Sequence, residues 1–432
     1  MPSDKKENVI IIGAGLAGLA LANVLKHQGV SYKIFERDAS PEDRTQGWSL
    51  SMHFCLLTLK TLMDPAKYAT LGDKSAVDPE NPRKGDFCLA NGNTGEPLVT
   101  VGSDTYDSNV DVFRVNRKRF RSWLMEGIDV TWNKRIDHYT INDDGNGVQV
   151  TFTDGTVEEG SVIVGADGVN SQVCRQLIGE DEFKTTTVPN PLRILAASYW
   201  IDSELRQEIK ENYSSAHMMA PSSISEEADH STCLFVSLVD VDKSKEKPYE
   251  MLWSVSCLDK EEPHHETNQE RLNQAKNWLK KSGCSGLLNR LVTGTPDDTE
   301  VVTLKIRERS PHSILDTFHG PVVLIGDALH SMTQFRGEGG NHAILDACLL
   351  GKELASLHKQ EKGLKEAINT YYSEALPRGR KAVAESHEAL NIVHGTRAQV
   401  FAMINGIAKS VEKMIEKMSQ EDSSSAVETS KQ

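Results

Sequence analysis

The chain of 432 residues contains little cysteine, no excess of positive charge and no long apolar run. Its seven scattered cysteines, odd in number and without a Cys-x-x-Cys pair, argue against a disulfide framework or a zinc site and favour a reducing compartment. Lys and Arg total 48 against 62 for Asp and Glu, and the net charge of −14 disfavours nucleic-acid binding. The apolar run over residues 9–25 is interrupted by glycines and is too short to span a membrane. We therefore expect a cytoplasmic protein with no transmembrane segment, no metal and no nucleic-acid partner.

The N-terminal segment has the pattern of a strand–helix–strand unit. Residues 9–12 are a continuous β-branched run, residues 16–25 repeat apolar side chains at helical spacing, and residues 32–35 form a second short strand. This pattern predicts an α/β fold with a Rossmann-like nucleotide-binding domain. The stretch over 64–95 is rich in Pro, Gly, Asp and Asn, which predicts loops.

The later chain changes character several times. Residues 188–309 alternate predicted strands with a helix pair and carry no glycine motif, which predicts an inserted sheet-rich domain. The nucleotide-binding pattern then resumes, so the first domain is predicted to be discontinuous, over 8–187 and 310–360. We predict C-terminal helices over 361–417 and a disordered tail over 418–432, because the tail has almost no apolar residues.

A G-x-G-x-x-G motif follows the first predicted strand. Gly13 allows the tight turn, Gly15 lets backbone N–H groups approach a pyrophosphate, and Gly18 lets the helix pack closely on the strand. Glu36 ends the second predicted strand, where an acidic residue binds ribose hydroxyls. The motif predicts a dinucleotide site but does not choose between NAD and FAD.

Two later segments also place a glycine-containing turn after an apolar strand. The first, GADGVNS over 165–171, sets the carboxylate of Asp167 at the end of its strand. The second, GDALHSMTQFRGEGGNHAILDA over 326–347, begins with Asp327 and continues through glycines into a helix near Asn341. The positive end of that helix would stabilise negative charge on an electron-accepting ring.

In this order, the three motifs resemble those of group A FAD-dependent monooxygenases, the aromatic-hydroxylase-like family, and most of all its fungal secondary-metabolism branch. The resemblance spans about residues 8 to 395 and is weakest in the middle. It implies a glutathione-reductase-like FAD-binding domain over 8–187 and 310–360. It also implies that the inserted sheet domain over 188–309 binds the substrate.

The resemblance also implies a role for each matching residue. Glu36 would bind the adenosine ribose, Asp327 the ribitol, and Asp167 would serve both FAD and the approach of NADPH. The remaining implied FAD contacts are Arg117, Gly47 with Arg44 close by, Gly340 and Asn341. For Arg117 and Arg121, a solvated basic helix face is the competing interpretation.

The chain departs from the family in the late loop, where Gln334 stands in place of the usual proline. Proline would fix φ and remove a donor, whereas glutamine does neither, so loop stiffness or substrate contact is expected to differ. His330 lies in the same segment, and a histidine held by internal hydrogen bonds is favoured over a catalytic base.

The function implied is oxygenation of a small molecule by FAD with NADPH or NADH and O₂, through a flavin C4a-hydroperoxide. The product would be a hydroxylated or epoxidised aromatic, polyketide, indole or terpenoid, made by a monomer or homodimer. No catalytic side chain is identified. Predicted pocket-lining residues are Trp48, His53, Tyr199, Phe235, Trp253 and Phe335.

Two alternatives stay open at this point. A flavin halogenase or isoprenoid reductase would share the nucleotide fold, although the sequence has no Trp-x-Trp motif of the halogenase type. A non-catalytic binder resembling the prenyl-GTPase chaperones (GDI-like) would share the first motif. Asp167 and Asp327 argue against that binder.

Overall fold

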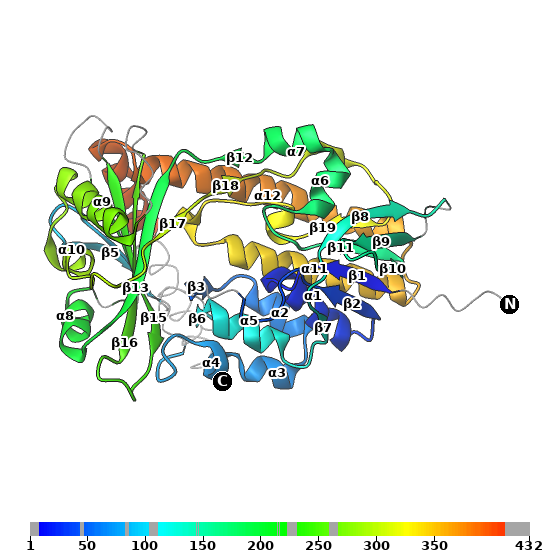
Figure 1. The fold of residues 1–432 in the computed structure, drawn as a ribbon, viewed down its shortest axis with the longest axis horizontal. Helices are drawn as coiled ribbons and strands as arrows, with labels where there is room; N and C mark the ends of the chain where they lie inside the picture. The colour runs from blue at the N-terminus through cyan, green and yellow to red at the C-terminus, as the bar shows by residue number, and fades with distance from the viewer. Residues whose placement is uncertain are drawn as a thin grey trace, which may run out of the picture. The chain divides into compact units, whose positions relative to one another are not determined.

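The computed structural model describes residues 8–43, 47–82, 86–102, 111–143, 145, 147–213, 215, 217–222, 231–258 and 267–410. They divide into two compact units (Figure 1). The first unit comprises Met1–Pro82, Phe113–Asn190 and Ile306–Ala389, and the second comprises Arg83–Val112, Pro191–Lys305 and Leu390–Gln432. Arg44 and the predicted disordered tail over 418–432 lie outside the described residues.

A five-stranded parallel sheet forms the centre of the first unit. Its order is β19-β11-β1-β2-β7, so the chain leaves β1 towards β2 and later returns on the other side of β1. The β-branched and apolar residues of β1, β11 and β19 are buried, as expected for strands covered on both faces. The five strands are β1 (Val9–Ile12), β2 (Tyr32–Phe35), β7 (Val130–Thr131), β11 (Val162–Gly165) and β19 (Val322–Leu324).

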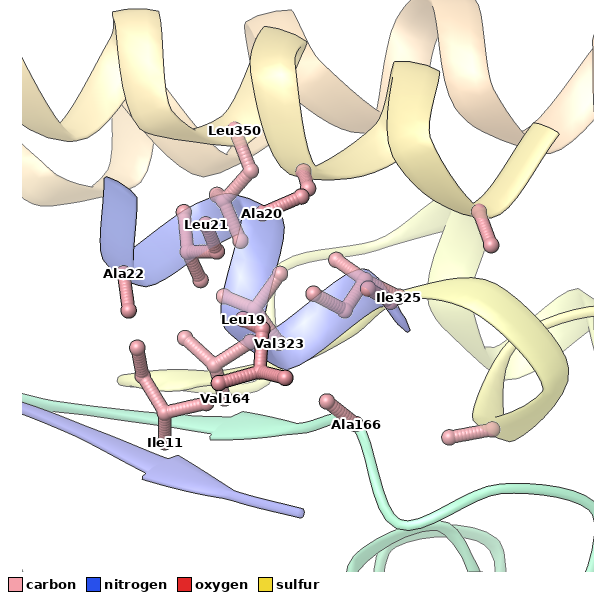
Figure 2. Close-up of a cluster of buried hydrophobic side chains, with 14 of the residues drawn as sticks. Ile11, Leu19, Ala20, Leu21, Ala22, Val164, Ala166, Val323, Ile325 and Leu350 are labelled. Atoms are coloured by element: carbon pink, nitrogen blue, oxygen red, sulfur yellow. The ribbon is translucent and has the colours of Figure 1, made fainter. Parts of the chain in front are cut away.

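Two helices, α1 (Leu16–His27) and α11 (Gly339–His358), stack on one face of this sheet. Figure 2 shows α1 between the strands and α11, with Leu19 directed at the sheet and Leu350 of α11 directed at α1. Gly351 permits the close helix contact, because a Cβ there would stand 2.5 Å from a methyl carbon of Val24. From a second, antiparallel sheet, Phe152 packs on Phe35 of β2 with ring centroids 4.8 Å apart.

The remaining elements of the first unit surround this core. They include the sheet of β8 (Ile136–Ile141), β9 (Val148–Phe152) and β10 (Val157–Gly160), and the two-stranded pairs β3 (Ser49–Met52) with β6 (Phe113–Asn116) and β12 (Val188–Pro189) with β18 (Arg307–Glu308). The helices are α2 (Leu56–Leu62), α3 (Pro65–Ala69), α4 (Leu71–Ser75), α5 (Arg117–Met125), α6 (Gln172–Ile178), α7 (Glu180–Thr186), α12 (Leu364–Val393), and the short 3₁₀ turns η2 (Ser313–Asp316), η3 (Gly326–Ala328) and η4 (Gln334–Arg336).

The prediction of loops over 64–95 is wrong, because this stretch contains α3, α4 and a strand. Asp64 caps α3 by accepting a hydrogen bond from the Ala66 amide (2.9 Å), and Pro65 occupies the first helical position. Proline is favoured there because the first N–H has no helical partner. The Asp-Pro pair was thus a helix start signal.

The second unit contains a seven-stranded sheet in the order β17-β13-β16-β15-β14-β4-β5. Its strands are β4 (Phe87–Ala90), β5 (Pro97–Val101), β13 (Arg193–Ile201), β14 (His217–Ser222), β15 (Thr232–Val241), β16 (Tyr249–Cys257) and β17 (Val302–Leu304). Its helices are α8 (Ser203–Tyr213), α9 (Asn268–Lys281), α10 (Gly286–Thr293) and residues 397–410.

Two boundaries differ from the predicted ones. Residues 86–102 were assigned to the nucleotide-binding stretch 8–187, but β4 pairs in parallel with β14 and so adds two strands to the second sheet. The predicted C-terminal helical segment over 361–417 is also divided. As far as Ala389, α12 belongs to the first unit, whereas His394 bonds to Ser256 of the second sheet (2.8 Å).

The start of α12 completes the edge of the parallel sheet. The Leu324 amide donates to the Tyr372 hydroxyl (3.0 Å), and the Tyr371 hydroxyl donates to the Leu324 carbonyl (3.1 Å). Both groups lie on the unpaired side of edge strand β19 and are buried with the two tyrosines. Among the residues described here, no helix is long and apolar enough to cross a membrane.

Candidate functional site

The predicted motif residues converge at one edge of the parallel sheet. Gly13 follows β1, Glu36 follows β2, Asp167 lies just beyond β11, and Asp327 lies just beyond β19. Parallel strands all present their carboxyl ends at the same edge, and ligands bind there where the strand order reverses. The reversal falls beside β1, between the first and second glycine motifs.

Gly13 and Gly18 are required by close packing, and Gly15 is not. Gly13 has φ +109°, and a Cβ there would collide with the Ala166 carbonyl oxygen of the second motif. A Cβ on Gly18 would collide with the carbonyl oxygen of Gly13. A Cβ on Gly15 would meet nothing within 4 Å, and no side chain caps α1 at this residue. The space and the free helix N-terminus suit a phosphate group.

Glu36 is buried (5% exposed) and fixed to the first motif. One carboxylate oxygen accepts from the Ala14 amide (2.8 Å), and the other accepts from the amides of Arg37 (2.8 Å) and Asp38 (3.2 Å). The carboxylate therefore lies beside the first turn, at the end of β2 where the motif places an acid for ribose hydroxyls. Glu36 thus has the position that the motif requires.

Arg121 contacts the same turn. Its Nε donates to the Ala14 carbonyl (3.0 Å) and its Nη1 to the Pro41 carbonyl (3.1 Å). The interpretation of Arg121 as a solvated helix face is wrong, because these bonds fasten α5 to the glycine motif. Only the tertiary contact reveals this role of Arg121, since the helix is basic along much of its length and the sequence does not set Arg121 apart.

The carboxylate of Asp167 is used locally. Its oxygens accept from the Ser171 hydroxyl (2.5 Å) and the Gln172 amide (2.7 Å), at the start of α6. Ser171 in turn caps α6 by accepting from the Cys174 amide (2.9 Å). Burial raises the pKa of Asp167, although the bond from Ser171 acts to lower it. Asp167 therefore anchors its own turn, and its predicted contact with FAD stays a prediction.

Asp327 is the accessible member of a buried segment. Residues 321–326 and 328–330 on either side are all buried, whereas Asp327 is exposed. Within the described part of the chain, its carboxylate has no hydrogen-bond partner. The surrounding protein raises the pKa of Asp327, while the charges of His330, Arg117 and Arg309 act to lower it. An available carboxylate at a strand end can accept hydrogen bonds from a ligand hydroxyl.

Arg117 and Gly47 lie on the first unit as well. Arg117 is half-buried at the start of α5, its amide donates to the Trp48 carbonyl (2.8 Å), and its charge acts on Asp327. Gly47, next to Trp48, is half-buried. The structure thus brings Arg117 into the electrostatic environment of Asp327, as a cofactor contact from α5 would need.

The N-terminus of α11 is open, and Asn341 fixes it in place. The side chain of Glu338, which precedes the helix, makes no capping hydrogen bond, and a Cβ on Gly340 would meet only ordinary contacts, the nearest 3.6 Å away on Leu50. The buried Asn341 amide donates to the Ser51 carbonyl (2.8 Å), and its oxygen accepts from the His53 amide (2.8 Å). The side chain of Asn341 thus joins α11 to β3, which leaves backbone N–H groups of the first turn for a ligand.

The loop with Gln334 is restrained without a proline. Thr333 donates two hydrogen bonds to Ser386, from its hydroxyl to the carbonyl (2.7 Å) and from its amide to the hydroxyl (3.3 Å). Arg336 makes a bidentate pair with Glu338 at 2.9 and 3.0 Å. The side chain of Gln334 is exposed, and the backbone carbonyl of Gln334 accepts from the Gly337 amide (2.9 Å). Bonds on both sides of Gln334 therefore supply stiffness that proline would give locally.

His330 is part of a buried ionic cluster behind the Asp327 turn. Its Nε2 lies 2.8 Å from a carboxylate oxygen of Asp346, which also accepts from the Gly326 amide (2.8 Å). The other oxygen of Asp346 pairs with Arg378 (2.7 Å). Although burial acts to lower it, the Asp346 carboxylate raises the pKa of His330. His330 therefore holds the turn in place through Asp346, in agreement with the favoured interpretation.

The pocket residues predicted in the second unit separate into two faces of its sheet. Trp253 donates through Nε1 to Thr295 (2.9 Å), two residues beyond α10, and the Tyr199 hydroxyl donates to the Leu291 carbonyl of α10 (2.7 Å), so both face the α10 segment. Phe235 lies on the opposite face, since its neighbour Val236 pairs with Trp253 and side chains alternate along a strand. Trp48, His53 and Phe335 are half-buried in the first unit.

These observations fit an FAD molecule along the strand ends. An acidic residue beside the first turn, space over Gly15, an available Asp327 and an open helix start at Gly340 match the groups that adenosine, pyrophosphate, ribitol and flavin would need. Within the residues described, every one of these groups belongs to the first unit.

Comparison with known proteins agrees with an FAD-binding site. The model of a family described as FAD binding domain matches residues 6–54 and 121–386, more than half of the chain. FAD-dependent monooxygenase thnD of Trichoderma harzianum is 34% identical over 394 residues, which cover 88% of this chain and 92% of that protein. FAD-dependent monooxygenase phnB of Penicillium herquei is 30% identical over 390 residues, which cover 90% of this chain and 91% of that protein.

Solved structures share the fold. HpxO of Klebsiella pneumoniae, solved with FAD and uric acid, matches with a TM-score of 0.73 at 17% identity over 95% of this chain and 96% of its own. The 2,6-dihydroxypyridine-3-hydroxylase of Arthrobacter nicotinovorans has a TM-score of 0.67 at 17% identity, covering 91% and 95%. The predicted α/β fold and the predicted resemblance to the fungal branch are both confirmed. The chain belongs to the FAD-binding-domain family of FAD-dependent monooxygenases.

Proposed function

We propose that the protein uses NADPH or NADH and O₂ to hydroxylate or epoxidise an electron-rich small molecule in secondary metabolism. The candidate substrates are an aromatic, a polyketide, an indole or a terpenoid. The observation that carries the proposal is the accessible carboxylate of Asp327 at the edge where all three glycine motifs meet. Cytoplasmic location and a monomeric or homodimeric state stay predictions of the sequence.

The residues of the first unit divide the task of holding FAD. Glu36 would bind the adenosine ribose, the backbone beside Gly15 the pyrophosphate, and Asp327 the ribitol. The first turn of α11, at Gly340 and Asn341, would lie beside the flavin, where its N–H groups favour negative charge on the ring. When bound, FAD supplies the electron transfer and oxygen activation, and the protein orients it and excludes water.

The second unit offers a face suited to a planar apolar substrate. On the side opposite Trp253, the rings of Phe87 and His217 lie 5.2 Å apart, and those of His217 and Phe235 lie 6.4 Å apart. Aromatic rings at such separations attract each other and further rings. This cluster supports an aromatic or polyketide substrate over a compact polar one.

The test is cofactor content followed by turnover. The purified protein should be yellow, should release one FAD per chain on denaturation, and should oxidise NADPH faster when the right aromatic substrate is added. Product mass should increase by one oxygen atom. A colourless protein that cannot be reconstituted with FAD would overturn the proposal, and so would NADPH oxidation that no substrate stimulates and that yields no oxygenated product.

A further inference from the structure

Arg309 joins the second and third motifs from beneath the site. Its Nη2 donates to the carbonyls of Asp327 (2.8 Å) and Ala328 (3.1 Å), and its Nη1 donates to the carbonyl of Val169 (3.1 Å). Val169 belongs to the GADGVNS turn, and the other two carbonyls belong to the turn that carries the available carboxylate. One guanidinium therefore sets the distance between two turns that leave adjacent strands of the sheet.

The environment of Arg309 is unusual for a purely structural residue. The side chain is 1% exposed and its guanidinium carbon lies 4.7 Å from the ring centroid of Phe183. Within the described ranges it forms no ion pair with a carboxylate, and its Nε has no hydrogen-bond partner. Burying a cation without a paired anion is unfavourable, and neutral carbonyls offset only part of that loss.

The positive charge of Arg309 acts on both motif aspartates. Burial lowers the pKa of Arg309, and the charges of Cys174, Asp167 and Asp327 act to raise it. The groups that face Asp327 are His330 from its own turn, Arg117 from α5, Arg309 from the segment after β18, and Asp346 from α11. The guanidinium of Arg309 also donates a hydrogen bond to the Asp327 backbone carbonyl.

We propose that Arg309 is a positioning residue for FAD, which fixes the Asp327 turn against the Asp167 turn and places a positive charge beneath the ribitol-binding carboxylate. The inference rests on the proposed role of this site in FAD binding. A residue with only a packing role would stabilise the fold equally with or without FAD. A positioning residue also alters the affinity for FAD and its dependence on pH.

The experiment compares Arg309→Met, Arg309→Lys and the control Arg307→Met by fluorescence titration of the apoproteins with FAD from pH 5 to 9. Arg307 is exposed, lies two residues away, and reaches the same turn through the Asn170 side chain (2.6 Å). We expect Arg309→Met to bind FAD about tenfold more weakly at pH 8, since it loses charged hydrogen bonds. Its loss of FAD in acid should occur about one pH unit higher, because Asp327 then protonates more readily. Arg307→Met should match the unmodified protein.

Arg309→Lys separates charge from geometry. It keeps the cation but not the planar fork, so FAD should bind more weakly while the pH midpoint stays that of the unmodified protein. If Arg309→Met does not fold, Arg309→Lys alone tests the proposal, and an unchanged FAD affinity in Arg309→Lys would overturn it. An unchanged affinity and pH midpoint in Arg309→Met would also overturn it. Failure of the unmodified protein to bind FAD would instead contradict the proposed function.

Discussion

Asp327 of the first unit and His394 of the second both lie among buried neighbours, but only His394 bonds fully within the protein. Nδ1 of His394 donates to the Leu390 carbonyl (2.8 Å) and Nε2 accepts from the Ser256 hydroxyl (2.8 Å). The carboxylate of Asp327 has no such partner in the described chain. A polar group that the fold leaves available indicates a ligand, whereas one that the fold satisfies indicates structure.

The same contrast divides the two motif aspartates. Asp167 and Asp327 follow adjacent parallel strands, and the surrounding protein raises the pKa of both carboxyl groups. The carboxylate oxygens of Asp167 accept hydrogen bonds from the start of α6, whereas those of Asp327 stay available to a ligand. We therefore expect damage at Asp167 to weaken the fold and damage at Asp327 to weaken cofactor binding.

The largest effect should come from Gly13→Ala. Its positive φ is unfavourable for alanine, and the new Cβ would collide with the Ala166 carbonyl, which together should reduce the free energy of unfolding by about 4 kcal/mol. Urea unfolding of the apoprotein measures this. Gly15→Ala is the matched control and should unfold like the unmodified protein while binding FAD more weakly. Equal stability losses in the two variants would contradict the packing roles assigned here.

Acid should weaken the protein through His394. Burial lowers the pKa of His394 to about 4, against about 6.5 in the unfolded chain. Its contribution is therefore full above pH 6.5 and is lost as the pH falls towards 4, a change of about 3 kcal/mol. Urea unfolding at several pH values should show this slope, and His394→Gln should lack it.

The pKa of His330 is shifted in the opposite direction to that of His394, so the two histidines should respond to pH in opposite ways. Because the pKa of His330 is raised in the folded state, its contribution is full below about pH 6.5 and is lost as the pH rises through the folded-state value. The variant His330→Gln should thus remove a loss of stability on the alkaline side. If both histidine variants flatten the acid side, the environment assigned to His330 is wrong.

Asp327→Ala should weaken FAD binding about a hundredfold, since two hydrogen bonds to a carboxylate would be lost. The melting temperature of the apoprotein should hardly change, because the side chain is exposed and has no hydrogen-bond partner in the described structure. Equilibrium dialysis and a thermal melt measure the two properties. A large fall in apoprotein stability with normal FAD affinity would place Asp327 among the structural residues.

Asp167→Ala should have the smallest effect, and unlike Asp327→Ala it should lower the stability of the apoprotein more than the affinity for FAD. Loss of the bonds to Ser171 and Gln172 should destabilise the apoprotein by about 1 kcal/mol, as for other helix-start residues. FAD affinity should fall less than tenfold. A loss of FAD binding equal to that of Asp327→Ala would show that Asp167 touches the cofactor, as the family resemblance implies.

The sequence identified the residues whose roles depend on local backbone geometry. Glycines after an apolar strand and an acid at the next strand end have fixed spacing, so Gly13, Gly15, Gly18 and Glu36 could be predicted from order alone. Asp327 followed from the same logic at β19. These features lie within one strand–turn–helix segment each, where chain connectivity determines what is close.

Residues that act across segments could not be predicted in this way. Arg309 falls at the end of the predicted middle domain, yet its guanidinium bonds to carbonyls 140 and 18 residues away. Asp346 joins the Gly326 amide from 20 residues later. No pattern in the sequence distinguishes these side chains from other charged residues. The pairing of β4 with β14 was missed for the same reason.

The tyrosine pair on edge strand β19 has a consequence for how the chain is made. The Leu324 backbone obtains its partners from residues 48 and 47 positions later, so the strand emerges from the ribosome well before its edge is closed. An open apolar strand edge pairs readily with other chains. Nascent chains ending between β19 and α12 should therefore be the species that most need a chaperone. The double variant Tyr371→Phe with Tyr372→Phe removes both hydrogen bonds to Leu324 and should lower the yield of soluble protein.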